Sequence, residues 1–202
     1  MRHILCYGDS NTWGTIGLWE ESTLPTDRFD RNHRWTGVLQ TALGDGFEVI
    51  EEGLGGRTTI YEKPGEAWKN GEPYLIPCLH THRPVDLIVI MLGTNDLLQF
   101  RTPQAACKKM ERFLKSLTLD RDKILLIAPM PMKIGEWVQD QKLTDDSITL
   151  AKNYKVLAER LGVRFADAGE WNIPIAYDGV HLTEEGHRAF AQRLIEYLHK
   201  GE

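Results

Sequence analysis

The stretch Val85-Asp86-Leu87-Ile88-Val89-Ile90-Met91-Leu92 is nearly continuous in apolar residues. A strand with one face in water alternates apolar and polar residues, whereas a strand that is buried on both faces does not. We therefore predict a central strand over 85–92. Because parallel sheets have helices on both faces, this strand also predicts a parallel sheet inside an α/β fold.

Shorter apolar runs elsewhere predict four more strands, at Ile4–Tyr7, Phe47–Ile50, Ile124–Ala128 and Val163–Ala166. Segments with apolar residues at helical spacing lie between the strands and after the last one, over 35–43, 64–82, 103–117, 147–161 and 184–199. Prolines are expected to break the second of these helices, and Asp146 or Ser147 is expected to cap the fourth. The alternation predicts a doubly wound, five-stranded parallel sheet in a three-layer α/β fold.

Length and composition fit one soluble domain. A chain of 202 residues can bury a sizeable core, so we expect residues 1–202 to form a single domain. The net charge of -5 gives no reason to expect nucleic acid or an anionic membrane as a partner. No apolar run approaches the roughly 18 residues that a membrane span requires.

Cysteine usage favours the cytoplasm. The three cysteines are an odd number without metal-type spacing, which indicates free thiols in a reducing compartment. A secretory leader is also hard to fit, because its removal would take away Ser10 or the strand before it.

Polar motifs follow the predicted strands. Gly8-Asp9-Ser10-Asn11 follows the first strand, Gly55-Gly56-Arg57-Thr58 the second, Gly93-Thr94-Asn95-Asp96 the third and Asp178-Gly179-Val180-His181 the last. The carboxyl ends of parallel strands meet at one edge, where open α/β sheets place their binding sites. We therefore expect these motifs to form one site.

The residue types of this site are those of a serine hydrolase. A serine hydroxyl is a weak nucleophile until a base takes its proton and a third group orients that base. We predict that Ser10 is the nucleophile, that His181 is the base and that Asp178 orients the imidazole.

Other groups in the motifs are expected to bind the negative oxygen of the tetrahedral intermediate. The candidates are the main-chain N–H of Ser10, that of Gly55 or Gly56, and the side-chain amide of Asn95. Glycine has a physical reason here, because a residue without Cβ lets the substrate approach its N–H closely. Spacing alone does not choose between the two glycines.

These blocks resemble the SGNH hydrolase superfamily, also called GDSL esterases and lipases. The four letters match Ser10, Gly56, Asn95 and His181 in order. The strings GDSNTWG at 8–14 and EEGLGGRTT at 51–59 are similar to the bacterial arylesterase and acyltransferase branch, some members of which make peracids.

This resemblance carries further expectations about the site. It implies that Gly56 is the oxyanion glycine. It also implies a flavodoxin-like sheet and metal-independent hydrolysis of short acyl or aryl esters through an acyl-enzyme, with no cofactor. Acyl transfer or perhydrolysis is a possible companion activity. One departure is Asn11, which stands where the family name implies leucine.

The resemblance further implies a shallow site that neighbouring subunits often close. The two long loops expected in this chain, 15–31 and 131–145, carry Trp19 and Trp137, which are plausible interface anchors. We therefore expect a homo-oligomer that acts on a small-molecule ester.

Three residues are candidates for contact with the substrate by position alone: Trp13, Ile134 and Ile175. Trp13 either lines the acyl pocket or packs against the first turn. No lipase-type lid is evident in the sequence, which disfavours long acyl chains.

Two other functions fit the same residues. One is a carbohydrate esterase that removes acetyl groups from sugars, and the other is a flavodoxin-like binding module without catalysis. We expect no metal site, because the pair His80-x-His82 has no carboxylate or cysteine cluster nearby in the sequence and fits a solvated helix end.

Overall fold

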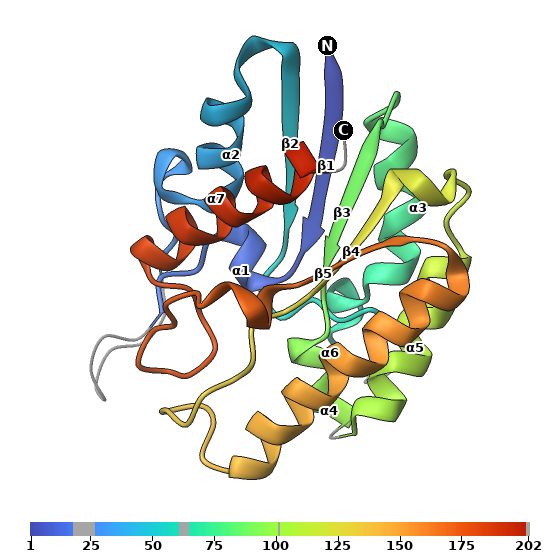
Figure 1. Ribbon diagram of the computed structural model, residues 1–202. Helices are drawn as coiled ribbons and strands as arrows, with labels where there is room; N and C mark the ends of the chain where they lie inside the picture. Colours follow the sequence, from blue (N-terminus) through green and yellow to red (C-terminus); the bar gives the residue numbers. More distant parts are fainter. Residues whose placement is uncertain (18–26, 61–64, 101, 201–202) are drawn as a thin grey trace.

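The computed structural model describes residues 1–17, 27–60, 65–100 and 102–200. Its strands are β1 (Arg2–Gly8), β2 (Phe47–Gly53), β3 (Leu87–Met91), β4 (Ile124–Ala128) and β5 (Arg164–Asp167). They form one parallel sheet in the order β2-β1-β3-β4-β5 (Figure 1). This is the flavodoxin-like order, in which the direction of winding reverses between β1 and β3. The predicted fold class is confirmed.

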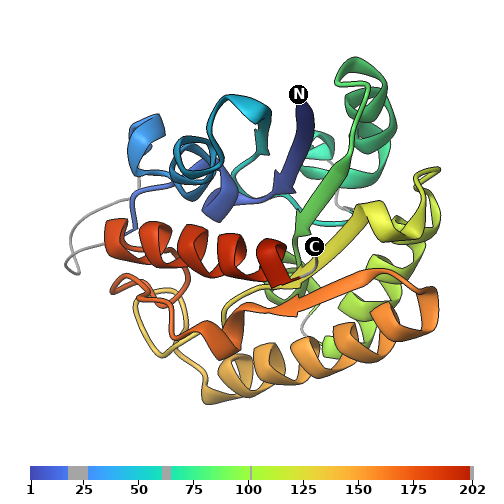
Figure 2. The same ribbon diagram turned by 45° about the horizontal axis from the view of Figure 1, so that its top comes forward.

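Helices cover both faces of the sheet. The longer ones are α2 (Trp35–Leu43), α3 (Gly71–Thr81), α5 (Pro103–Lys115), α6 (Gln141–Leu161) and α7 (Glu184–Lys200). Helices α2 and α7 pack on one face, and α3, α5 and α6 pack on the other (Figure 2). Short helices α1 (Ser10–Trp13) and α4 (Thr94–Phe100) start just beyond β1 and β3.

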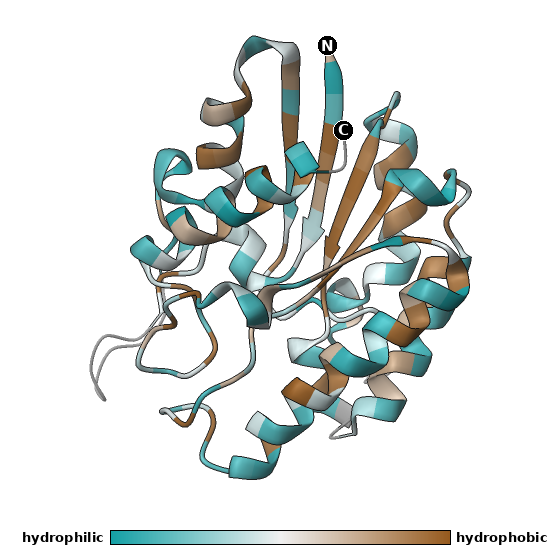
Figure 3. Ribbon diagram, viewed as in Figure 1, coloured by the Kyte–Doolittle hydropathy of each residue, from teal (hydrophilic) through white to brown (hydrophobic). Residues whose placement is uncertain are grey.

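The sheet separates two apolar clusters. All five residues of β3 are buried, and the strand is coloured as hydrophobic in Figure 3. Successive residues along the strand belong to opposite clusters. Ile88 and Ile90 pack with α5 and α6, whereas Val89 and Met91 pack with α2 and α7. The continuous apolar run at 85–92 therefore reflects burial on both faces, as predicted.

The start of α6 was predicted wrongly. The helix begins at Gln141 instead of near Ser147, and Asp140 caps it by accepting a hydrogen bond from the main-chain N–H of Lys142 at 2.8 Å. The first turns of α6 are mostly polar and lie at the surface, so they carry no apolar periodicity that would mark a helix. The loop after β4 consequently ends at residue 140.

Two shorter helices also differ from expectation. Residues 94–100 form α4, where the sequence predicted no helix. Helix α3 is continuous from Gly71 to Thr81, with Asn70 as its N-cap and Pro77 inside it. Pro73 falls in the first turn, where a missing N–H costs no hydrogen bond.

Within the described part of the chain, no helix combines the length and the apolar character that crossing a bilayer requires.

Candidate active site

Ser10 is the first residue of α1, directly beyond the carboxyl end of β1. Asp9 caps this helix by accepting a hydrogen bond from the N–H of Asn11 at 3.0 Å. A Cβ atom at Gly8 would come within 2.0 Å of the Thr12 hydroxyl, so only glycine permits a turn this tight. Local sequence thus fixes the serine at the carboxyl edge of the sheet, beside the point between β1 and β3 where the direction of winding reverses.

A chain of hydrogen bonds joins Ser10, His181 and Asp178. The Oγ atom of Ser10 lies 2.9 Å from Nε2 of His181. On the other side of the ring, Nδ1 of His181 lies 2.8 Å from Oδ2 of Asp178. The structure therefore brings together the three residues that the sequence singled out, from opposite ends of the chain.

The Asp178 carboxylate is fully buried and strongly hydrogen-bonded. Its Oδ1 accepts hydrogen bonds from the N–H groups of Val180 and His181, at 2.8 and 2.9 Å. Burial alone would raise the pKa of Asp178, but the hydrogen bonds and the charge of His181 outweigh it and lower the pKa to about 2. Asp178 is therefore ionised at neutral pH and can stabilise a positive imidazolium.

Asn11 holds the histidine segment against the serine turn. Its Nδ2 donates to the carbonyl of Val180 at 3.2 Å, and its Oδ1 accepts from the N–H of Leu182 at 2.9 Å. These two partners flank His181 on either side. The sequence marked Asn11 only as a departure from the family name, and its positioning role was missed because the contacts span about 170 residues.

We predict that Asn11→Leu lowers both activity and stability. The change leaves the carbonyl of residue 180 and the N–H of residue 182 unpaired in a buried site, which costs about 1–3 kcal/mol of unfolding free energy. A shift of the imidazole by about 1 Å would lower kcat by up to about 10²-fold. Ester turnover and chemical denaturation measure the two effects, and an unchanged kcat would remove Asn11 from the positioning of His181.

The oxyanion candidates border the same cleft. Gly55, Gly56 and Asn95 line it together with Ser10. Gly56 has a φ of 73°, a left-handed conformation that favours glycine, which separates it physically from Gly55. One N–H of the Asn95 amide donates to the carbonyl of Arg57 at 3.1 Å, which orients the amide and leaves its second N–H for another acceptor.

A buried carboxylate joins the β2 loop to α4. Asp96 accepts hydrogen bonds from the main-chain N–H of Thr59, at 3.1 and 3.2 Å to its two oxygens, and from the Thr59 hydroxyl. Burial raises the pKa of Asp96 to about 7, although the bonds from Thr59 act in the opposite direction. Gly56 lies on the loop after β2 and Asn95 lies on α4. The bonds between Thr59 and Asp96 therefore fix these two oxyanion candidates relative to each other.

The cleft has a volume of about 270 Å³ and is lined by Ser10, Thr15, Gly55, Gly56, Asn95, Leu98, Trp137, Val180 and His181. The bulkiest side chain among these residues is that of Trp137. Its ring meets the His181 ring edge-on, with the ring centroids 4.9 Å apart and an angle of 80° between the ring planes. The sequence indicated Trp137 as an interface residue and missed this contact with the imidazole. Trp19 lies outside the described residues.

The three residues proposed from the sequence to contact the substrate are not among those that line this cleft. The face of the Trp13 ring is covered by the Arg28 guanidinium, with 4.9 Å between that group and the ring centroid. Ile134 is 58% exposed, and Ile175 is half-buried and bridges to Leu182. Their contact with a substrate stays a prediction.

The chain resembles one known protein family and several solved structures. The model of the GDSL-like lipase/acylhydrolase family matches residues 6–189. A native aryl esterase of M. smegmatis is 37% identical, with 99% of each chain covered and a TM-score of 0.88. Est24, a carbohydrate acetylesterase from Sinorhizobium meliloti, is 33% identical, with 100% of each chain covered and a TM-score of 0.88.

A putative arylesterase from Agrobacterium tumefaciens is also similar, at 34% identity over 99% of each chain and a TM-score of 0.84. A search of curated proteins gave no match. The family model spans the serine, glycine, asparagine and histidine blocks alike. The chain therefore belongs to the GDSL-like lipase/acylhydrolase family.

Proposed function

We propose that the protein is a serine esterase that hydrolyses short-chain acyl or aryl esters through an acyl-enzyme. Family membership and the similarity to aryl and carbohydrate esterases support a carboxylic ester hydrolase. The observation that carries the mechanism is the unbroken chain of hydrogen bonds from Ser10 through His181 to Asp178.

In the proposed mechanism, His181 takes the proton of Ser10 as Oγ attacks the ester carbonyl. Asp178 accepts a hydrogen bond from Nδ1 and stabilises the imidazolium that forms. The imidazolium then gives its proton to the departing alcohol, and the acyl group remains on Ser10. A water molecule, deprotonated by His181, releases the acid in the second half.

The tetrahedral intermediates place a negative charge on the former carbonyl oxygen. We propose that the N–H groups of Ser10 and Gly56 and the second amide N–H of Asn95 bind this oxygen. Every proton in the cycle moves between groups of the chain, the ester and water, so the mechanism needs neither a metal nor a cofactor.

We predict that Asn95→Ala lowers kcat by about 10²–10³-fold, because one donor to the oxyanion is lost. KM should change little, since the donor acts mainly on the negative oxygen of the transition state. Steady-state kinetics with p-nitrophenyl acetate measure both parameters. A rise in KM at unchanged kcat would instead place Asn95 in ground-state binding.

The size of the cleft favours small acyl groups. Its volume of about 270 Å³ lies below the range of roughly 300–1,000 Å³ that is usual for pockets that hold drug-sized ligands. Leu98, Val180 and Trp137 give it apolar walls beside Ser10. We therefore expect acetyl or similarly short esters as substrates. By the family resemblance, we also propose transfer of the acyl group to alcohols or peroxide as a companion reaction.

A second candidate function is a carbohydrate acetylesterase, which the similarity to Est24 over the whole chain favours. Turnover of p-nitrophenyl acetate compared with an acetylated xylo-oligosaccharide separates the two functions. An aryl esterase should have the higher kcat/KM for the first substrate and a carbohydrate esterase for the second. Absence of turnover with both, and with esters of graded acyl length, would favour the third reading, a binding module without catalysis.

We also propose a homo-oligomer. Trp137 is 41% exposed and lies on the loop after β4, which the family resemblance associates with subunit contacts. We predict a mass of at least two chains by size exclusion with light scattering at micromolar concentration. A monomer under these conditions would exclude the proposed assembly.

We propose the cytoplasm as the location of the protein. The three cysteines are free thiols, and Cys6 and Cys78 are buried, which is compatible with a reducing compartment. Fractionation of cells that produce the protein tests this location.

A further inference from the structure

A glutamate, a cysteine and a histidine meet where α3 packs beside the edge strand β2. Glu52 lies on β2, Cys78 lies on α3, and His82 is the C-cap residue directly after α3. One ligand-type atom from each residue, the carboxylate oxygen, the sulfur and a ring nitrogen, lies within 4.8 Å of the other two. None of the three lines the cleft beside Ser10.

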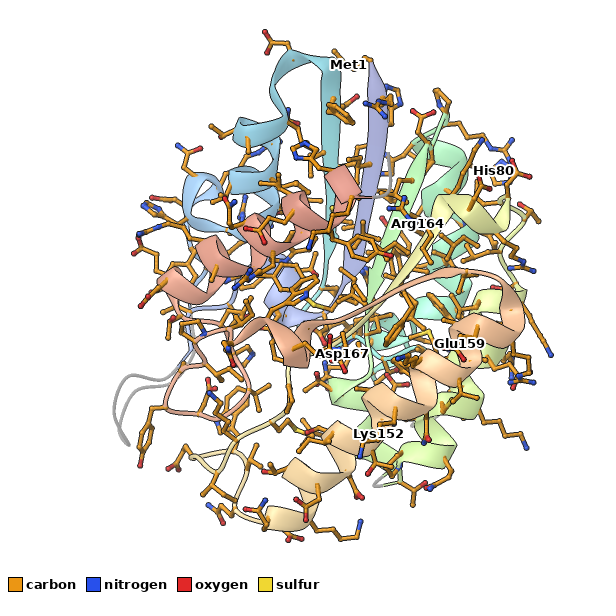
Figure 4. The ribbon with its side chains drawn as sticks, in the orientation of Figure 1. Met1, His80, Lys152, Glu159, Arg164 and Asp167 are labelled. Carbon is orange, nitrogen blue, oxygen red and sulfur yellow. The ribbon has the colours of Figure 1, made fainter. Side chains whose placement is uncertain are left out.

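This cluster corrects an expectation from the sequence, which gave the histidines at 80 and 82 no cysteine or carboxylate neighbours. Cys78 and His82 are four residues apart, so the helix places them on one face, one turn apart. Glu52 comes from a strand 30 positions earlier, and only the fold brings it there. His80 is exposed and lies at the periphery of the molecule (Figure 4).

Two side chains hydrogen-bond to the Glu52 carboxylate, and the sulfur of Cys78 lies close to it. Oε1 lies 2.8 Å from Nε2 of His82, and the hydroxyl of Tyr74 donates to Oε2 at 3.1 Å. The sulfur of Cys78 lies within 4.8 Å of a Glu52 carboxylate oxygen.

The donor set is the one that zinc prefers. Thiolate, imidazole and carboxylate are its usual protein ligands, and three of them with a water molecule complete a tetrahedral site. Bonds of 2.0–2.3 Å in a tetrahedron place neighbouring ligand atoms about 3–4 Å apart. Because the three atoms are already within 4.8 Å, small side-chain rotations are enough to reach that geometry.

We propose that Glu52, Cys78 and His82 bind a zinc-type divalent cation, with water in the fourth position. On binding, two ligand atoms, the sulfur of Cys78 and Nε2 of His82, give up their protons. The Cys78 thiol loses its proton to solvent, and the proton on Nε2 of His82 moves to Nδ1. The carboxylate, the thiolate and the dication then sum to zero charge, which a half-buried site tolerates.

Neighbouring groups fit this assignment. The side chains of His82 and Glu52 are 27% and 17% exposed, so a cation can enter from solvent while Cys78 stays buried. Tyr74 holds the second carboxylate oxygen, as outer-sphere partners of metal ligands do. The Arg57 guanidinium donates a hydrogen bond to the main-chain oxygen of Glu52. Its positive charge would repel the cation, and the two anionic ligands, the carboxylate and the thiolate, offset this repulsion.

Proton release gives the site a pH dependence. A cysteine without a bound cation is a thiol at neutral pH, and the thiolate is the form that binds a metal. Since binding must release this proton, affinity for the cation is expected to rise with pH.

The test uses the full chain after chelator treatment, titrated with Zn²⁺ alone by calorimetry and with Co²⁺ alone by absorption. We expect one cation per chain and a thiolate-to-cobalt charge-transfer band. Cys78→Ser should abolish the band, and both Cys78→Ser and His82→Gln should weaken Zn²⁺ binding by more than about 100-fold, beyond the effect of outer-sphere partners. Tyr74→Phe should weaken it by roughly 10–100-fold.

Matched controls lie close by. His80→Gln changes an exposed imidazole two residues away, and Cys107→Ser changes a thiol on α5; both should bind as the wild type does. Zn²⁺ should raise the Tm of the wild type but not that of His82→Gln. This variant is chosen because the His82 side chain is partly exposed, so its replacement disturbs folding less than a change at the buried Cys78. Ser10→Ala should bind Zn²⁺ normally, so this test is independent of the esterase proposal.

The proposal is overturned if the wild type shows no saturable Zn²⁺ binding. It is equally overturned if Co²⁺ binds without the charge-transfer band, if binding survives in both Cys78→Ser and His82→Gln, or if His80→Gln abolishes it.

Discussion

Ser10→Ala is expected to lower kcat for p-nitrophenyl acetate by about 10⁶-fold, the loss seen when a serine hydrolase loses its nucleophile. The variant keeps His181, Asp178 and the oxyanion donors. Because these groups bind and polarise an ester without attacking it, a residual rate about 10³–10⁴-fold above that of water should remain. Steady-state kinetics, with protein purified separately from any wild-type enzyme, measure this loss.

The matched control is Ser147→Ala. Ser147 is as buried as Ser10 and does not line the cleft, and its hydroxyl accepts a hydrogen bond from the N–H of Met132 at 3.0 Å. This control should lose stability and keep its kcat. A fluorophosphonate that labels activated serines should modify the wild type and Ser147→Ala but not Ser10→Ala. Wild-type turnover by Ser10→Ala would refute the proposed nucleophile.

The five strands could be predicted because each is an apolar run whose burial leaves a mark in the sequence. The short helix after β3 and the first turns of α6 could not. Helix α4 is seven residues long, too short for a periodic pattern, and Leu143 is the single apolar residue in the stretch 141–147 at the start of α6. In both places capping and tertiary packing, which no short window of sequence contains, decide where the helix begins.

The residues of the site divide in the same way. Ser10, Asn95 and His181 stand in local motifs at strand ends, so a sequence with a parallel sheet already indicates that they meet. Asn11 and Trp137 act through partners that are about 170 and 44 positions away in the chain. Contacts of this kind depend on the register of the sheet and on loop conformation, neither of which residue types alone specify.

The same reasoning applies to Glu52, Cys78 and His82. Two of them stand at helical spacing, which is visible in the sequence, but the third ligand comes from a neighbouring strand. A pair of residues four apart is common on any helix, so the pair alone carried no information about a metal. The fold adds the carboxylate and makes the cluster specific.

His181→Ala is expected to lower kcat by about 10³-fold or more, because the proton of Ser10 then has no acceptor within hydrogen-bonding distance. If the two residues act as one unit, Ser10→Ala and the double variant Ser10→Ala/His181→Ala should be about equally inactive, since the effects of triad residues are not additive. Rates that multiply in the double variant would instead mean that the serine and the histidine act in separate steps.

The control for this variant is His187→Gln. His187 is a buried histidine on α7 whose Nδ1 accepts a hydrogen bond from the N–H of Trp35 at 3.3 Å, and burial lowers its pKa to about 3. Its loss should reduce the free energy of unfolding and leave kcat within a few-fold. Because the pKa of Asp178 is about 2, that carboxylate stays ionised across the pH range of an ester assay and cannot cause an acid limb in the rate profile. An acid limb in the wild type therefore has to come from another group, and Asp96, whose pKa burial raises to about 7, is one candidate.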